Sequence, residues 1–110
     1  MTEREIRILQ LENGRVPYNE WYESLLDKRM RAAVQLRMAR IRNGNFGDHK
    51  PVGEGVFELR IDLGPGLRIY YGEYQGKLVL LLGGGDKRTQ RRDIATAITW
   101  WNQWKQFKKK

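Results

Sequence analysis

The sequence contains no cysteine and a single histidine, His49. Without cysteine the chain can form neither a disulfide framework nor a thiolate metal site, and one histidine cannot build a histidine metal site. No apolar run reaches membrane-spanning length, and the N-terminus lacks the hydrophobic stretch of a signal peptide. We therefore expect a soluble, cytoplasmic protein that has no bound metal and no membrane partner.

Acidic residues are also few, since 21 Lys and Arg outnumber 13 Asp and Glu and leave a formal net charge of +8. This excess favours a polyanionic partner such as RNA, DNA or an acidic protein, although basic residues also simply keep small proteins in solution. Four tryptophans and five tyrosines favour nucleic acid slightly, because exposed rings stack on bases. The length of 110 residues predicts one small domain, residues 1–110.

Three consecutive antiparallel strands are the clearest pattern in the chain. Apolar and polar residues alternate in the first two segments, and the third is a short apolar run. Turn residues separate the segments, Gly64-Pro65-Gly66 in the first connection and Gln75-Gly76 in the second. The strands are expected over residues 56–63, 67–71 and 78–82.

The register of these strands follows from keeping their apolar side chains on one face. A three-residue first loop places Ile61 opposite Ile69, whereas a slip by one residue would mix the two faces. In this register Asp62 faces Arg68, and Arg60 faces Tyr70. The second hairpin sets Leu80 by Tyr71 and Leu82 by Ile69. One face of the sheet is then apolar, and the other carries Arg60, Arg68 and Tyr70, with Lys87 and Arg88 at its end.

The residues before these strands predict a strand and a helical hairpin. Residues 4–11 alternate like a strand, and Pro17 suits the first turn of a helix with one apolar stripe. Asp27 is the expected N-cap of a second helix that ends at residues 43–44. Several arginines of this second helix either form a solvated face or contact phosphates or an acidic partner: Arg29, Arg31, Arg37, Arg40 and Arg42.

The remaining segments predict a loop, a turn and a last helix. Residues 44–55 are expected to form a loop in which Phe46 packs back onto the core. The glycines of residues 83–85 either cradle a phosphate or form a permissive turn from strand to helix, and their spacing is not that of a Walker loop. Thr89 is the expected cap of the helix that follows.

Two long stretches resemble a known protein family. They read GNFGDHKPVGEGVFELRIDLGPGLRIYY over residues 44–71 and LLLGGGDKRTQRRDIATAI over residues 80–98. These motifs are similar to those of the RelE/ParE toxin superfamily, in its addiction module killer branch close to HigB-type toxins, and the similarity extends from Tyr18 onward. The resemblance implies an α+β, RelE-like fold with an N-terminal strand, a helical hairpin, a three-stranded antiparallel meander and a C-terminal helix.

The same resemblance implies a toxin of a type II toxin–antitoxin system, held inactive by a cognate antitoxin that is a small helix-turn-helix protein. RelE-like members are endoribonucleases that cut mRNA, usually on the ribosome, without a metal or cofactor. Their chemistry needs extra negative charge on the phosphate to be stabilised, which arginine can do at every relevant pH. ParE-like members instead inhibit DNA gyrase without being enzymes, and the net charge alone would also allow a plain RNA- or DNA-binding module.

By similarity, Arg68 matches the strand arginine that contacts the scissile phosphate, and Arg60 matches a basic position on the preceding strand. Relatives with a clear acid/base group carry Tyr or His near the start of the last helix, where this chain has Asp93, so either Asp93 or Tyr70 would serve. A further position that is lysine in RelE is here Glu58. The residues implied for catalysis are Arg60, Arg68, Tyr70, Arg88 and Asp93. Those implied for RNA binding are Lys50, Lys87, Arg91 and Arg92.

Overall fold

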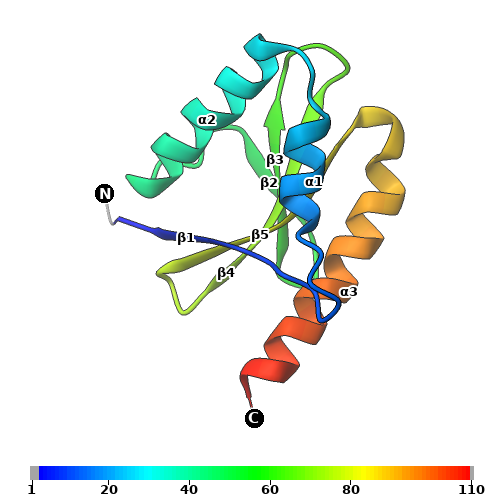
Figure 1. Cartoon of the computed structure of the whole chain (residues 1–110). Coiled ribbons are helices and arrows are strands. Elements are labelled where there is room, and N and C mark those ends of the chain that lie inside the picture. Colours follow the sequence, from blue (N-terminus) through cyan, green and yellow to red (C-terminus); the bar gives the residue numbers. More distant parts are fainter. Residues whose placement is uncertain (1–2, 110) are drawn as a thin grey trace.

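The chain forms an α+β fold that ends in a long helix, as predicted. The computed structural model describes residues 3–109 (Figure 1). None of the helices in this part of the chain is long and apolar enough to cross a membrane. The elements follow in the order β1 (Glu5–Ile8), α1 (Pro17–Ser24), α2 (Lys28–Arg42), β2 (His49–Gly53), β3 (Val56–Ile61), β4 (Leu67–Tyr74), β5 (Leu78–Asp86), the 3-10 turn η1 (Lys87–Thr89) and α3 (Gln90–Lys108).

The strands form one mixed sheet in the order β1-β5-β4-β3-β2. Strands β2, β3, β4 and β5 pair in antiparallel order, and the predicted three-stranded meander corresponds to β3, β4 and β5. Strand β1 pairs with β5 in parallel. The predicted loop over residues 44–55 is wrong in part, because His49 to Gly53 pair with β3 as an edge strand. Pro51 interrupts any strand pattern there, and an edge strand tolerates it because one side needs no ladder hydrogen bonds.

Both faces of the sheet are covered by helices, so the prediction of one open polar face is wrong. Helices α1 and α2 pack on one face over a core that includes Val34, Ile41, Leu59, Ile69, Leu81 and the predicted stripe residue Tyr18. Helix α3 packs on the other face over a core of Leu9, Val56, Tyr70, Leu80, Leu82, Ala97 and Trp101. Figure 1 shows α3 running along one side of the strands.

The first hairpin differs from the predicted register by two residues. Ile61 pairs with Leu67 and Arg60 pairs with Arg68, which leaves residues 62–66 as the connection. An even shift keeps every side chain on its expected face, so the alternation was interpreted correctly. The pairing partners were predicted wrongly. Asp62 lies in the connection between the strands and does not face Arg68.

The second hairpin contains a β-bulge that the sequence analysis missed. Tyr71 pairs with Leu81 but Tyr70 pairs with Gly83, so Leu82 is the extra residue. The predicted pairs are therefore wrong, and Leu80 and Leu82 lie beneath α3 and not on the face of Tyr71 and Ile69. The strand then continues to Asp86, and the glycines of residues 83–85 form neither a turn nor a phosphate cradle. A Cβ atom on Gly84 would overlap the indole ring of Trp21, so this glycine lets α1 sit directly on the strand.

The cap of α2 is confirmed, whereas that of the last helix is not. The Asp27 carboxylate accepts a hydrogen bond from the Arg29 backbone N–H at 2.8 Å, as expected of an N-cap. Before α3, Asp86 caps η1 by accepting from the backbone N–H groups of Arg88 and Thr89. Thr89 itself makes no side-chain cap. The chain therefore turns from β5 into α3 around Asp86.

Two arginines of α2 stabilise the fold and do not belong to a solvated face. The guanidinium of Arg31 donates to the carbonyls of Leu25 and Glu23, at the end of α1. That of Arg37 donates to the carbonyls of Phe46, Asp48 and Arg60. Arg37 therefore ties the connection before β2 to the end of β3, and Phe46 packs against the core as predicted.

Candidate functional site

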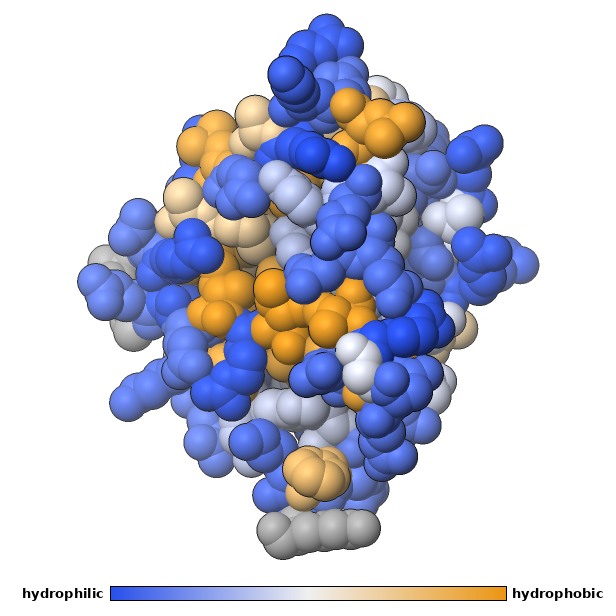
Figure 2. Space-filling view, viewed as in Figure 1, coloured by the Kyte–Doolittle hydropathy of each residue, from blue (hydrophilic) through white to orange (hydrophobic). Residues whose placement is uncertain are grey.

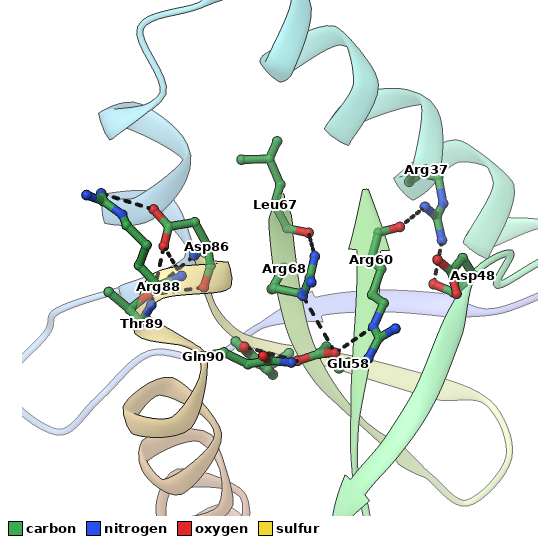
Figure 3. Close-up of polar contacts among 11 residues, drawn as sticks. Arg37, Asp48, Glu58, Arg60, Leu67, Arg68, Asp86, Arg88, Thr89 and Gln90 are labelled. Carbon is green, nitrogen blue, oxygen red and sulfur yellow. Dashed lines mark hydrogen bonds and ion pairs between the residues drawn. The ribbon is translucent and has the colours of Figure 1, made fainter. Parts of the chain in front are cut away.

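Arg60 and Arg68 lie directly opposite each other on β3 and β4, on the sheet face that α3 covers. They lie at the margin of that cover, because 34% of the Arg60 side chain and 11% of the Arg68 side chain remain exposed. Figure 3 shows both guanidinium groups beside Glu58, with Gln90 reaching the same carboxylate from the start of α3. A pair of like charges at this position in a sheet is destabilising unless an anion compensates it.

Glu58 supplies that anion and is fully buried. Its Oε1 lies 3.0 Å from Arg60 Nε and 3.7 Å from Arg68 Nε. Its Oε2 accepts a hydrogen bond from Gln90 Nε2 at 2.7 Å and from the Tyr70 hydroxyl at 3.3 Å. Burial acts to raise the pKa of Glu58, but the hydrogen bonds from Gln90 and Arg60 and the charge of Arg68 lower it below its usual value. The carboxylate is therefore ionised.

Both guanidinium groups have N–H donors that make no hydrogen bond to another described residue and are available to a ligand. Arg60 Nε donates to Glu58, and among residues 3–109 this is the only hydrogen bond of the Arg60 guanidinium. Arg68 Nη1 donates to the Leu67 carbonyl at 3.2 Å, while its buried Nε has no hydrogen-bond partner in the described structure. A planar guanidinium fork matches the oxygens of a phosphate. The pair is therefore suited to bind an anion at the edge of the sheet.

Tyr70 is not at the surface, contrary to the predicted open face. It is 1% exposed beneath α3, and its hydroxyl contacts only the buried Glu58 among the described residues. Burial, together with the charges of Glu58 and Asp93, raises the pKa of Tyr70 well above its usual value. Tyr70 therefore supports the Glu58 carboxylate from beneath α3.

Asp93 lies beside the arginine pair, in the first turn of α3. Its carboxylate occupies the space that a Cβ atom on Gly85 would fill, and Gly85 pairs with Arg68 across the sheet. The Thr89 hydroxyl donates to Asp93 Oδ2, which fixes the carboxylate. Arg60 on β3, Arg68 on β4 and Asp93 of α3, which lies over Gly85 of β5, therefore form a row. The Asp93 side chain is 20% exposed.

The other predicted residues surround this row on the surface. Lys50 lies on β2 opposite Glu58, and η1 and the first turn of α3 carry the rest. All are exposed: Lys50, Lys87, Arg88, Arg91 and Arg92. Arg88 pairs with Asp86 at 3.4 Å, yet 83% of its side chain remains exposed. Together with Arg60 and Arg68, these five residues form what we call the basic rim.

One known protein is similar in sequence to most of this chain. A Haemophilus influenzae protein, described as uncharacterized, is 48% identical over 80 residues, which cover 73% of this chain and 81% of that protein. The chain belongs to the family of this Haemophilus protein. No family model matches the sequence. Membership in the family assigns no activity, so function has to be inferred from the site.

Two residues at the centre of the site were missed as site residues. Glu58 was noted only as a departure from the lysine of RelE, and Gln90 was not singled out. The alternation of residues in β3 places Glu58 on the same face as Arg60, so the sequence alone could have indicated that these two side chains are neighbours. The contact between Glu58 and Gln90 depends on how α3 packs on the sheet. No local sequence pattern predicts that packing.

Proposed function

We propose that the protein is the toxin of a type II toxin–antitoxin system and acts in the bacterial cytoplasm as a metal-independent mRNA endoribonuclease. The observation that carries this proposal is the Arg60–Arg68 pair, which a buried carboxylate holds at the margin of α3. The five exposed residues of the basic rim add positive charge around this pair. RNA presents a phosphate at every nucleotide, and basic residues supply most of its binding energy. The resemblance of the sequence motifs to those of the RelE/ParE superfamily supports the same proposal, and the α+β fold is compatible with it.

In the proposed reaction the 2′-hydroxyl attacks the adjacent phosphorus, a P–O bond forms, and the bond to the 5′-oxygen breaks. Arg60 and Arg68 donate to the non-bridging oxygens, where negative charge develops in the transition state. Asp93 is the acid/base group of the row and takes the proton of the 2′-hydroxyl. The 5′-oxygen leaves with a proton from solvent or from Asp93. Tyr70 has no direct part, because it is buried.

The exposed part of the basic rim is proposed to hold translated mRNA and the ribosome. Lys50, Lys87, Arg91 and Arg92 carry their charges on long, exposed side chains, which suit contact with phosphates along a strand. Such contacts carry no information on sequence. They would fix the position of the RNA backbone relative to the Arg60–Arg68 pair.

Expression of the protein without a partner is expected to arrest bacterial growth, because cleavage of translated mRNA stops protein synthesis. The measurement is growth and amino-acid incorporation after induction, with the Arg68→Ala variant expressed to the same level as the matched control. Unimpaired growth at a good yield of folded wild-type protein would contradict the proposal.

The same experiment separates the proposal from two other functions. A ParE-like inhibitor of DNA gyrase would cause DNA damage and filamentation while early protein synthesis continues. Phosphoryl transfer needs the paired arginines, whereas binding to a protein target does not, and this favours the endoribonuclease. A plain RNA- or DNA-binding module would bind nucleic acid in vitro and leave it uncut.

A cognate antitoxin, a small helix-turn-helix protein, is proposed to inhibit this site with an acidic or amphipathic segment. The net charge of +8 favours an acidic segment, since opposite charges speed association. The association rate is expected to fall about tenfold or more from low to high ionic strength. Stopped-flow or surface-binding kinetics over a salt series would measure it. A rate that stays constant across the series would count against this partner.

The molecule also offers apolar surface to such a segment. A groove between the segment that follows β1 and the C-terminal half of α3 has an apolar part formed by Leu9, Leu11, Trp100, Trp104 and Phe107. The rest of its lining is polar or charged, and includes Arg7, Glu12 and Lys108. Figure 2 shows hydrophilic residues over most of one side of the molecule, interrupted by a hydrophobic area near the centre of the view. An amphipathic segment could therefore combine apolar contacts with charge.

A further inference from the structure

Glu58 is the one charged side chain among residues 3–109 that is buried. Its carboxylate receives contacts from three elements, from Arg60 on β3, from Arg68 and Tyr70 on β4, and from Gln90 on α3. Burying a carboxylate is costly unless charges and hydrogen bonds compensate it. An apolar residue would fill this position in a core at no such cost, which indicates that the charge is used.

We propose that Glu58 is a positioning residue that holds Arg60 and Arg68 together as an anion clamp and joins the clamp to the start of α3. Both guanidinium groups approach the same oxygen, Oε1, through their Nε atoms. The Nη groups of Arg60 make no hydrogen bond to another described residue and therefore keep their donors for a ligand. Glu58 itself is fully buried and does not touch that ligand. The use of the clamp in RNA cleavage rests on the proposed function.

This role has opposite effects on binding and on cleavage. A negative charge next to two arginines weakens their long-range attraction for RNA, so removing it should leave RNA binding unchanged or tighter. Cleavage depends instead on fixed donors at the atoms where charge develops, so loss of the orientation should slow it. A purely structural role would reduce both, and a role in charge neutralisation alone would increase both.

The test compares Glu58→Gln with Glu73→Gln. The control removes one negative charge from the same sheet, since Glu73 lies on β4 and pairs with Arg4 at 3.9 Å, outside the clamp. Binding is measured with an RNA that has a 2′-deoxy nucleotide at the scissile position, and cleavage is measured in single turnover per folded molecule. Glu58→Gln is expected to lower cleavage about ten- to hundredfold, the range for lost positioning partners, without weakening binding. Glu73→Gln should change neither.

A second readout is independent of RNA cleavage. The Nε–H groups of Arg60 and Arg68 are followed by NMR, and exchange of the Arg60 proton with water should speed up about tenfold in Glu58→Gln, because a neutral amide oxygen accepts a weaker hydrogen bond than a carboxylate does. If Glu58→Gln does not fold, Gln90→Ala removes only the bond to Oε2 and should give a smaller change in the same direction. Glu73→Gln again serves as the control.

Each outcome decides a separate question. Unchanged arginine exchange, or cleavage that stays equal to or exceeds that of the wild type, would overturn the positioning role. Binding and cleavage reduced by the same factor would overturn it as well, in favour of a structural role. Wild-type protein that leaves RNA intact would overturn the proposed function, and the exchange measurement would then decide the positioning role alone.

Discussion

Replacement of Arg68 by alanine is expected to lower the rate of RNA cleavage about a hundredfold or more, the effect of removing one charge donor from a transition state. The variant should fold, because Arg60 and Gln90 still compensate the buried carboxylate of Glu58. It should also still bind the antitoxin. The measurement is cleavage of ribosome-bound mRNA by wild type and variant at equal concentrations of folded protein.

Two further variants make the result specific. Arg68→Lys should recover only part of the activity, because a point charge cannot reproduce the planar fork. Arg7→Ala removes an arginine from β1, paired with Glu5 at 2.7 Å and outside the site, and should leave the rate unchanged. If Arg68→Ala cleaves as fast as the wild type, Arg68 only balances the charge of Glu58 and has no catalytic role. If the wild type itself leaves mRNA uncut, inhibition of gyrase becomes the better hypothesis.

Replacement of Trp101 by alanine is expected to lower the free energy of unfolding by about 3–5 kcal/mol, the usual cost of deleting a buried large aromatic side chain. Trp101 is 2% exposed, and its ring lies where a Cβ atom on Gly72 would be. It also stacks on Trp104 with ring centroids 5.5 Å apart. No smaller side chain would fill the space between α3 and the sheet.

Urea unfolding followed by circular dichroism would measure this loss, with Trp104→Ala as the matched control. Trp104 packs on the same cluster but is only partly buried, so its replacement should cost clearly less. A loss below about 1 kcal/mol for Trp101→Ala would mean that α3 is held mainly by other contacts, such as that between Gln90 and Glu58.

The sequence predicted the faces of β3 and β4 correctly, but neither their pairing nor the faces of β5. Side-chain alternation depends on single residues, and a shift of two residues in the first hairpin preserves it. The loop length was misjudged because Gly64-Pro65-Gly66 has the composition of a complete tight turn. In the structure Leu63 and Gly66 also close the turn, through a backbone hydrogen bond of 3.1 Å. The bulge at Leu82 could not be predicted, because a continuous apolar run shows no alternation that an extra residue would interrupt.

For the site, the arginines could be predicted and their environment could not. Arg60 and Arg68 occupy positions that motifs and alternation both indicate. Glu58 and Tyr70 look like members of a polar face, and their burial results from the packing of α3 far along the chain. Edge strand β2 was missed for a related reason, since Pro51 and the neighbouring glycines give no strand pattern and pairing with β3 decides its structure.

The parallel pairing of β1 with β5 has a consequence for synthesis of the chain. Ile6 pairs with Val79, so the first strand has no partner until all of residues 7–78 have been made. Gln90, which anchors the carboxylate between the two arginines, is made later still. A nascent chain therefore has neither its completed sheet nor its completed site until residue 90 has been made. The order of synthesis itself delays formation of the site.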